Sequence, residues 1–324
     1  MLKMQEIIRP IEQEFEVFKE LFDASLQSTN PLLKEVITYI KQRRGKLMRP
    51  ILVLLTARAF GEIGTSTYHA ASSLELLHTA SLVHDDVVDE SDKRRGQKSV
   101  NAVYDNKVSV LVGDYLLSTS LKEASLTGNI KIVNAISKLG QDLSEGEIVQ
   151  LSTISDSVFS EEIYFEVIRK KTAALFATSA ELGACSVDST DEMVKIACLL
   201  GELIGIAFQI KDDIFDYYTS DTLGKPTGND MREGKLTLPA LYVLNAFEDD
   251  EMKKVALRIR SLEAAPTEID GFIQYVKEKG GIDYAHKVMM DYRNKALALL
   301  PSTVPSEIKD SLTAYIDYVI NREK

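Results

Sequence analysis

Residues 82–89 have the sequence LVHDDVVD, in which an apolar helical pattern runs directly into three aspartates. Residues four apart share one face of a helix, so Asp85 and Asp89 point the same way, with Asp86 beside them. A long helix with a carboxylate cluster near its end is therefore the first element that the sequence predicts.

A second stretch repeats this pattern far downstream. Residues 208–216 have the sequence FQIKDDIFD, in which Asp212 and Asp216 again share a helix face, with Asp213 next to Asp212. Two such clusters predict two acidic walls that face one another across a cavity.

The position of these aspartates indicates a bound cation. A helix C-terminus carries partial negative charge and disfavours each carboxylate by about 0.3–1 kcal/mol. A single acidic run usually just faces water, but two trios that both follow apolar runs and precede basic residues are typical of a magnesium–phosphate site. Magnesium binds one or two carboxylates, several waters and substrate phosphates. The predicted metal ligands are Asp85, Asp86, Asp89, Asp212, Asp213 and Asp216.

Basic residues beside the trios stand out against an acidic background. The 324-residue chain has a net charge of −11, which argues against general nucleic-acid binding and against docking on anionic lipid. Arginine binds phosphate oxygens in pairs and lysine supplies a point charge, as a departing diphosphate requires. Any one such cation is usually only a solvated surface residue. The candidates are Lys46, Arg49, Arg94, Arg95, Lys171, Lys211, Lys225 and Lys235.

The rest of the chain predicts an all-α protein. Apolar residues recur with the helical period, alternating strand patterns are scarce, and no Pro/Gly/Ser-rich linker divides the sequence. We expect a single domain over residues 1–324, with about a dozen helices around a central cavity. Helices are predicted at 4–25, 31–41, 67–90, 107–127, 130–153, 160–184 and 190–216, with further starts near Pro50, Pro239, Pro266, Gly281 and Pro305, and a loop at 91–96.

The cysteines and the N-terminus indicate a cytoplasmic protein. Cys185 and Cys198 are the only cysteines, both in apolar helical context, and they do not have metal-ligand spacing. The first residues lack the apolar core of a signal peptide, and no uninterrupted apolar run is long enough for a membrane span. We expect no stable membrane anchor, and a passing association with the membrane surface stays open.

Two other sequence features give weaker evidence for a functional site. The pairs Gly224-Lys225 and Gly234-Lys235 do not match the P-loop pattern and follow no strand, which excludes a P-loop kinase or ATPase. His78 lies two turns before the first trio, where a lone histidine is more often a packed polar residue than a ligand.

The motifs together closely resemble the trans-type polyprenyl diphosphate synthases, in particular the long-chain, octaprenyl-like members. The likeness rests on Asp85-Asp86-x-x-Asp89 followed by Arg94-Arg95-Gly96, on Asp212-Asp213-x-x-Asp216 followed by Gly224-Lys225 and Gly234-Lys235, and on Gly45-Lys46-x-x-Arg49-Pro50, Lys171-Thr172 and Phe208-Gln209. It covers residues 40–240 in the family's order.

The resemblance implies the isoprenoid synthase fold, a homodimer, and head-to-tail prenyl transfer with about three magnesium ions. It implies that Asp85, Asp89 and Asp212 bind the metal and that Asp86, Asp213 and Asp216 support them. An allylic diphosphate, farnesyl or geranylgeranyl, would be bound by Arg94, Lys171, Lys211 and Lys225, with Lys235, Thr172 and Gln209 nearby. Isopentenyl diphosphate would be bound by Lys46, Arg49, His78 and Arg95. The catalytic set is then Asp85, Asp86, Asp89, Lys171, Lys211 and Asp212.

Product length is predicted from the residues before the first trio. Ala80 and Ser81 are small, whereas a bulky aromatic there would close the tunnel for the growing chain, and Leu77 comes next along the helix. One helical turn is about 5.4 Å, close to one extended isoprene unit, so we expect about 30–50 carbons, as in a quinone side chain. Close helix packing is the alternative reason for small residues at these positions.

Three alternatives remain. A short-chain farnesyl or geranylgeranyl diphosphate synthase has the same chemistry with a higher tunnel floor. A terpene cyclase also uses an aspartate-rich helix and magnesium, but it needs neither the second complete trio nor Lys46 and Arg49. A non-catalytic subunit of a heteromeric synthase is disfavoured because the charged positions are intact, although a catalytic subunit that depends on a partner stays possible.

Overall fold

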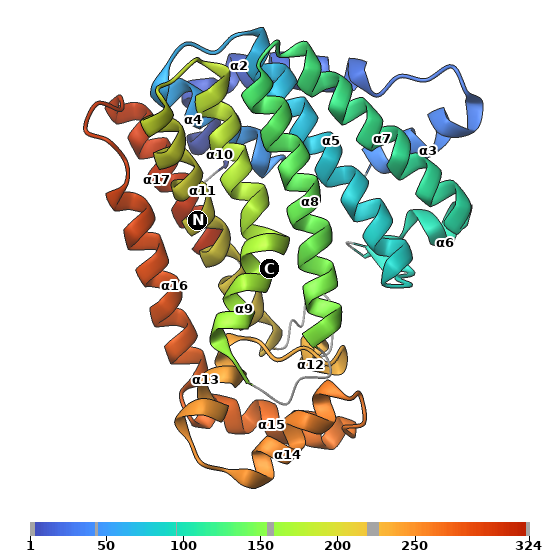
Figure 1. The fold of residues 1–324 in the computed structure, drawn as a ribbon, viewed down its shortest axis with the longest axis vertical. Coiled ribbons are helices and arrows are strands. Elements are labelled where there is room, and N and C mark those ends of the chain that lie inside the picture. The colour runs from blue at the N-terminus through green and yellow to red at the C-terminus, as the bar shows by residue number, and fades with distance from the viewer. Residues whose placement is uncertain (1–3, 43–44, 95, 154–158, 219–226, 322–324) are drawn as a thin grey trace. The chain divides into compact units, whose positions relative to one another are not determined.

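The computed structural model describes residues 4–42, 45–94, 96–153, 159–218 and 227–321. Helices make up nearly all of this part of the chain (Figure 1), which confirms the all-α prediction. The helices are labelled α1 to α17, more than the predicted dozen, because short ones such as α1 (Met4–Ile8) and α12 (Asn229–Arg232) escape a periodicity analysis.

The chain forms two compact units. Unit 1 comprises residues 1–140, 175–201 and 301–314, and unit 2 comprises residues 141–174, 202–300 and 315–324. Helices α8 (Ile130–Thr153), α11 (Asp191–Asp216) and α17 (Ser306–Asn321) contribute residues to both units. The expectation of one domain over residues 1–324 stays a prediction.

Unit 1 contains the N-terminal helices and the first aspartate trio. Pro10 lies in a 3-10 turn, so the predicted helix at 4–25 is divided there. The loop predicted at 91–96 instead contains the first strand of a short antiparallel hairpin, in which Lys93 pairs with Lys98 and Arg94 with Gln97. The elements are α1, the turn Arg9–Ile11, α2 (Glu12–Ser25), α3 (Pro31–Lys41), α4 (Met48–Phe60), α5 (Thr65–Val88), β1 (Lys93–Arg94), β2 (Gln97–Lys98), α6 (Val100–Tyr104), α7 (Asn106–Leu126) and most of α10 (Ala174–Ser186).

Local signals explain several of these boundaries. Pro31 opens α3, and the Asn30 side chain accepts a hydrogen bond from the Leu33 N–H at 3.1 Å, which satisfies a donor that the helix start leaves open. Helix α4 is buried continuously from Pro50 to Ala57. An apolar surface on every side is typical of a helix at the centre of a core.

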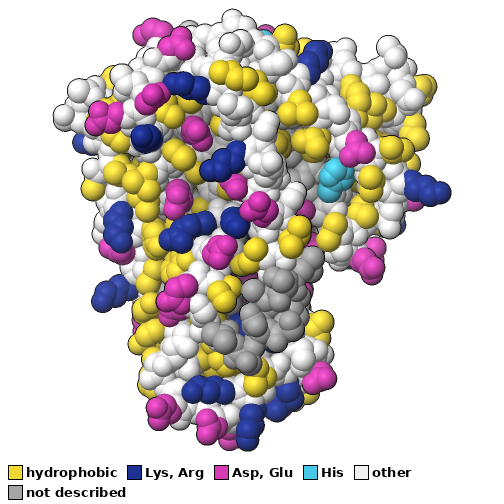
Figure 2. Space-filling view, in the orientation of Figure 1, with side chains coloured by type: hydrophobic (Ala, Val, Ile, Leu, Met, Phe, Trp, Pro, Cys, Tyr) yellow, Lys and Arg dark blue, Asp and Glu magenta, His cyan; other side chains and the backbone are white. Residues whose placement is uncertain are grey.

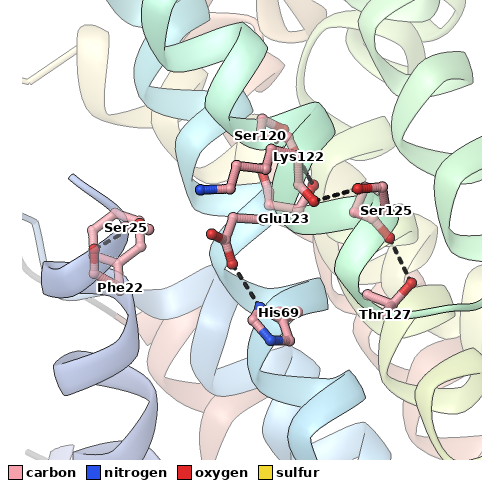
Figure 3. Close-up of polar contacts among 10 residues, drawn as sticks. Phe22, Ser25, His69, Ser120, Lys122, Glu123, Ser125 and Thr127 are labelled. Carbon is pink, nitrogen blue, oxygen red and sulfur yellow. Dashed lines mark hydrogen bonds and ion pairs between the residues drawn. The ribbon is translucent and has the colours of Figure 1, made fainter. Parts of the chain in front are cut away.

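Helices α5 and α7 pack side by side, as Figure 1 shows. Polar side chains join them: the Ser73 hydroxyl donates to the Ser120 carbonyl at 2.8 Å, and His69 Nδ1 lies 2.7 Å from Glu123 Oε2 (Figure 3). The Glu123 carboxylate is buried. A buried carboxylate needs such a partner, so these pairs fix the register of α5 against α7.

Unit 2 contains the second aspartate trio. The predicted start at Ser160 is confirmed, because its hydroxyl accepts a hydrogen bond from the Ile163 N–H at 3.2 Å. Gly280, at φ 79°, separates α15 from α16, which is a backbone conformation that glycine adopts readily. The elements are α9 (Glu161–Ile168), a π-helical segment (Arg169–Ala173), α12, α13 (Leu238–Ala246), α14 (Asp250–Arg260), α15 (Pro266–Glu278) and α16 (Gly281–Ala298).

Among the described residues, α11 alone is long and apolar enough to cross a membrane, judged by length and composition only. Its most apolar 18-residue window has a mean hydropathy of 1.8 and is 44% buried inside the structure. The core helix of a soluble protein meets the same criterion, so this is weak evidence for a span.

Candidate active site

The first trio lies at the C-terminal end of α5. Asp85 is in the last turn, and Asp89 is the exposed residue at which the helix ends. Asp86 is 3% exposed, and its Oδ1 accepts a hydrogen bond from Arg94 Nε at 2.6 Å. The hairpin is therefore tied to α5 through Asp86. Arginine has five N–H donors, so this bond leaves Arg94 with capacity to bind a phosphate.

A strained backbone precedes α4, between two residues predicted to bind isopentenyl diphosphate. Leu47 has φ 51° and ψ 37°, a left-handed conformation that is costly for a bulky residue. The exposed Lys46 precedes it, and the Arg49 guanidinium lies 5.3 Å from the centre of the Phe176 ring. Strain of this kind often marks a functional segment.

The second trio lies at the C-terminal end of α11. Asp213 is 2% exposed, and protein donors bind both of its oxygens. The Tyr164 hydroxyl donates to Oδ2 at 2.5 Å and Gln209 Nε2 donates to Oδ1 at 2.8 Å. Burial, with the nearby Asp230 carboxylate, raises the pKa of Asp213 to about 8. Asp213 is thus bound within the protein.

Asp216 fixes the segment that follows the trio. Its two carboxylate oxygens accept hydrogen bonds from the backbone N–H groups of Asn229 and Asp230, each at 3.0 Å. The Lys235 N–H in turn donates to the Asp230 carbonyl at 2.7 Å. Burial, with the Asp216 charge, raises the pKa of the Asp230 side chain to about 6. These bonds place Lys235 relative to the trio.

Lys171 and Thr172 lie in the π-helical segment between α9 and α10. Such segments are rare and occur frequently at functional sites. Lys171 Nζ lies 2.5 Å from Glu147 Oε2 and 3.2 Å from Gln150 Oε1, while the Thr172 hydroxyl donates to Gln209 Oε1 at 2.7 Å. The extra residue of this turn is accommodated by close packing on α11, where a Cβ on Gly205 would lie 2.5 Å from the Ala173 Cα.

Unit 2 contains a pocket of about 240 Å³ that gathers many of these side chains. Its apolar wall includes Ile163, Val167 and Leu241. A cationic and hydrogen-bonding wall beside an apolar one suits an anionic head group on a hydrocarbon chain. Of the predicted residues, the pocket is lined by Lys171, Thr172, Gln209, Asp213 and Lys235.

Three further residues of this pocket were missed by the sequence analysis: Tyr164, Asp230 and Arg260. Tyr164 is seven residues before Lys171, which is a weak signal that the two share a helix face. Asp230 and Arg260 give no local signal, since only the fold brings them to this wall.

The remaining predicted residues fall into three groups. Lys211 and Asp212 belong to unit 2, where the Lys211 ammonium lies 4.5 Å from the centre of the Phe215 ring. Arg95 and Lys225 lie outside the described residues. Lys46, Arg49, His78, Arg94 and the first trio belong to unit 1. That the two trios face one cavity stays a prediction.

The three residues predicted to set chain length point in different directions. Ser73 and His84 of α5 contact α7. Ala80 lies seven residues after Ser73 and four before His84, so it shares their face of the helix. Its small size therefore fits close packing between α5 and α7. Ser81, four residues before Asp85, is half-buried on the same stripe as that aspartate. The Leu77 side chain points to α8: its Cδ1 lies 3.9 Å from the position that a Cβ atom on Gly140 would occupy.

The donor atoms of the two trios fit magnesium. Among the described residues, no group of three or more His, Cys, Asp or Glu side chains is close enough to hold a metal by itself. Magnesium rarely uses such an all-protein cage, and binds one or two carboxylates together with substrate phosphates. Protein donors bind Asp86, Asp213 and Asp216. That Asp85, Asp89 and Asp212 are the metal ligands stays a prediction.

Comparison with known proteins identifies the family. The family model described as polyprenyl synthetase matches residues 30–276. The octaprenyl diphosphate synthase of Haemophilus influenzae is 33% identical, over 99% of this chain and 98% of its own.

Similar solved structures support the same family assignment. A geranylgeranyl pyrophosphate synthase from Bacteroides thetaiotaomicron is 53% identical, with a TM-score of 0.86 over 98% of this chain and 99% of its own. A polyprenyl synthase from Caulobacter crescentus, solved with calcium and isoprenyl diphosphate, is 29% identical with a TM-score of 0.90, over 99% of this chain and 98% of its own. The resemblance seen in the sequence and the isoprenoid synthase fold are confirmed: the chain belongs to the polyprenyl synthetase family and is a prenyltransferase.

Proposed function

We propose that this chain is a long-chain polyprenyl diphosphate synthase, which condenses isopentenyl diphosphate with an allylic diphosphate to give a product of about 30–50 carbons. The observation that carries the proposal is the likeness to an octaprenyl diphosphate synthase along the whole chain. The unit 2 pocket supports it, because it combines Lys171, Lys235 and Thr172 with an apolar wall.

Magnesium is the cofactor of this proposal. The Caulobacter crescentus relative was solved with calcium, another hard divalent cation that oxygen ligands bind. Asp85, Asp89 and Asp212 would hold the magnesium, with Asp86, Asp213 and Asp216 in support. When bound, the ions neutralise the negative charge that builds on a departing diphosphate.

The chain's own residues then act on both substrates. Arg94, Lys171, Lys211, Lys225 and Lys235 bind the allylic diphosphate and stabilise it as its C–O bond breaks and the electron pair stays on the diphosphate oxygen. Lys46, Arg49, His78 and Arg95 hold isopentenyl diphosphate so that its double bond attacks the allylic carbon. The new cation then loses a proton to the released diphosphate. In this scheme the protein mainly positions two diphosphates and excludes water.

A shorter product is the second candidate. The Bacteroides thetaiotaomicron structure, 53% identical to this chain, is a geranylgeranyl pyrophosphate synthase, which makes a short-chain prenyl diphosphate. Against this candidate, the long-chain proposal is supported by the absence of a bulky side chain at Ser81, the small residue on the stripe of Asp85. Ala80 supports it less, since its size fits packing against α7.

A product-length assay decides between these candidates. Purified protein is given magnesium, labelled isopentenyl diphosphate and farnesyl diphosphate, and the dephosphorylated products are separated by length. Products of about 30 carbons or more support the proposal. A stop at geranylgeranyl favours the second candidate. No condensation by the chain alone would overturn self-sufficient activity and lead to a search for a partner subunit.

We propose a cytoplasmic location for the protein. We also propose that it forms a homodimer, which associates through the outer face of α7. This face has exposed Val110, Leu111, Leu117 and Leu121, outside the stripe of buried residues on α7. Figure 2 shows hydrophobic side chains gathered over this region, at the upper right. The molar mass of the protein in solution tests the dimer: Leu111→Lys should shift it to the monomer. Leu257→Lys, at an exposed position on α14, should not.

A further inference from the structure

The buried carboxyl group of Asp213 lies in the middle of a chain of hydrogen bonds that no sequence motif reveals. Its partner Tyr164 lies on α9, 49 residues away in the sequence, and the Tyr164 side chain is itself buried. The phenol donates to one carboxyl oxygen at 2.5 Å, at the short end of the range for an O–H···O bond.

The other oxygen of Asp213 continues the chain back to the basic segment. Gln209 donates to it at 2.8 Å, and Thr172 donates to the Gln209 side-chain oxygen at 2.7 Å. Tyr164 lies on α9, and Thr172 lies beside Lys171 in the π-helical segment that follows. The four side chains therefore link α9 and the π-helical segment to the last turns of α11 at two points.

If a single contact joined α9 and the π-helical segment to α11, the two parts could rotate about that contact and change the distance from Lys171 to Asp212. With two contact points, Tyr164–Asp213 and Thr172–Gln209, this rotation is prevented. Asp212 directly precedes Asp213, so the direction in which it points follows from how Asp213 is held. Since buried polar networks are rigid only when every member has a partner, each bond of this chain matters to the others.

We infer that Tyr164 is a positioning residue for prenyl transfer. By holding Asp213 it sets the placement of Asp212 relative to Lys171, and so aligns metal binding with allylic diphosphate binding. In this role Tyr164 acts through Asp213. The inference rests on the proposed function, because it assigns the residue a part in that reaction.

The test compares two tyrosines that make the same kind of bond. Tyr164→Phe removes the hydroxyl that binds Asp213 and leaves the ring in place. The matched control is Tyr284→Phe, which removes a phenol that donates to Glu161 Oε2 at 2.8 Å. Glu161 is also on α9, but it does not belong to the hydrogen-bond chain that includes Asp213. Hydrogen–deuterium exchange is measured on both variants free of metal, together with steady-state kinetics at varied magnesium and substrate.

For Tyr164→Phe we expect faster exchange in residues 161–173 and 204–216. The KM for the allylic diphosphate and the magnesium concentration for half-maximal rate should rise about tenfold, as for loss of one buried hydrogen bond. The KM for isopentenyl diphosphate should not change. Tyr284→Phe should match the wild type in all four quantities.

The outcomes separate the two proposals. If Tyr164→Phe matches Tyr284→Phe in exchange and kinetics, while the wild type is active, the positioning role alone is overturned. A wild-type chain without condensation activity would overturn the proposed function and this role in it together. Should Tyr164→Phe fail to fold, Gln209→Leu interrupts the same chain one bond later, and an unchanged allylic KM in that variant would overturn the inference.

Discussion

The contact between Gly113 of α7 and His84 of α5 offers a test in which stability and activity separate. A Cβ on Gly113 would lie only 2.1 Å from His84 Nε2, so the imidazole occupies the space of the missing methyl group. There the His84 Nε2–H donates to the Val110 carbonyl at 3.1 Å, and it lies 3.6 Å from the Asp114 carboxylate. Gly113→Ala must therefore move the ring of the residue that directly precedes Asp85.

The expected change in the free energy of unfolding is small because two terms oppose each other. Alanine is favoured over glycine inside a helix by about 0.8–1.0 kcal/mol. Loss of the His84–Val110 hydrogen bond costs about 0.5–1.5 kcal/mol, and the partly exposed pair with Asp114 contributes about 0–1 kcal/mol. The His84 side chain is 32% exposed and can turn toward solvent. We expect a Tm within about 4 °C of the wild type.

Activity should fall much further. The turn that carries Asp85 loses the side chain that joins it to α7, and a misplacement of about 1 Å can reduce a rate about 100-fold. Calorimetry gives the Tm, and condensation rates at several magnesium concentrations give the activity. His84→Ala should show the same loss, and the double variant should lose no more, because both changes remove one contact. Full activity in Gly113→Ala, or a Tm more than about 10 °C lower, would refute the reasoning.

Three further predictions concern the metal, the tunnel and a buried thiol. Asp85→Ala should reduce turnover by orders of magnitude with an unchanged circular dichroism spectrum; a near-normal rate would remove Asp85 from the metal site. Ser81→Phe should shorten the product in a chain-length separation, and an unchanged product would show that Ser81 does not line the tunnel. Burial, with the nearby Glu181 carboxylate, raises the pKa of the Cys185 thiol to about 11, so its reactive thiolate forms only as the pH approaches that value. Native protein at about pH 8 should then resist iodoacetamide at Cys185 in peptide mass spectrometry, and rapid alkylation there would contradict this.

Local signals in the sequence predicted the features that depend on near neighbours. Pro31 with Asn30, and Ser160 before α9, mark helix starts because their effects act within one turn. The aspartate trios were found for the same reason, since four-residue spacing places side chains on one face. The short strand at Lys93–Arg94 was missed, because two residues are too few for an alternating pattern.

Features that depend on distant contacts could not be predicted in this way. The π-helical segment packs closely on α11 where Gly205 meets Ala173, and that contact joins residues 32 positions apart in the numbering. The face of Ala80 depends on which side of α5 meets α7, and neighbouring residues on a helix differ by about 100°. Tyr164 is the clearest case, because its partner Asp213 belongs to another helix and no spacing rule connects them.

The two trios use their middle aspartate in the same way. Asp86 is 3% exposed and bound by Arg94, while Asp213 is 2% exposed and bound by Tyr164 and Gln209. Because adjacent side chains on a helix point about 100° apart, an Asp-Asp pair can direct one carboxylate inward and leave the next one half-buried. The inward carboxyl group accepts hydrogen bonds from protein donors, which fix the turn. The inward carboxylate of each trio is thus an anchor for the turn that carries the neighbouring aspartate.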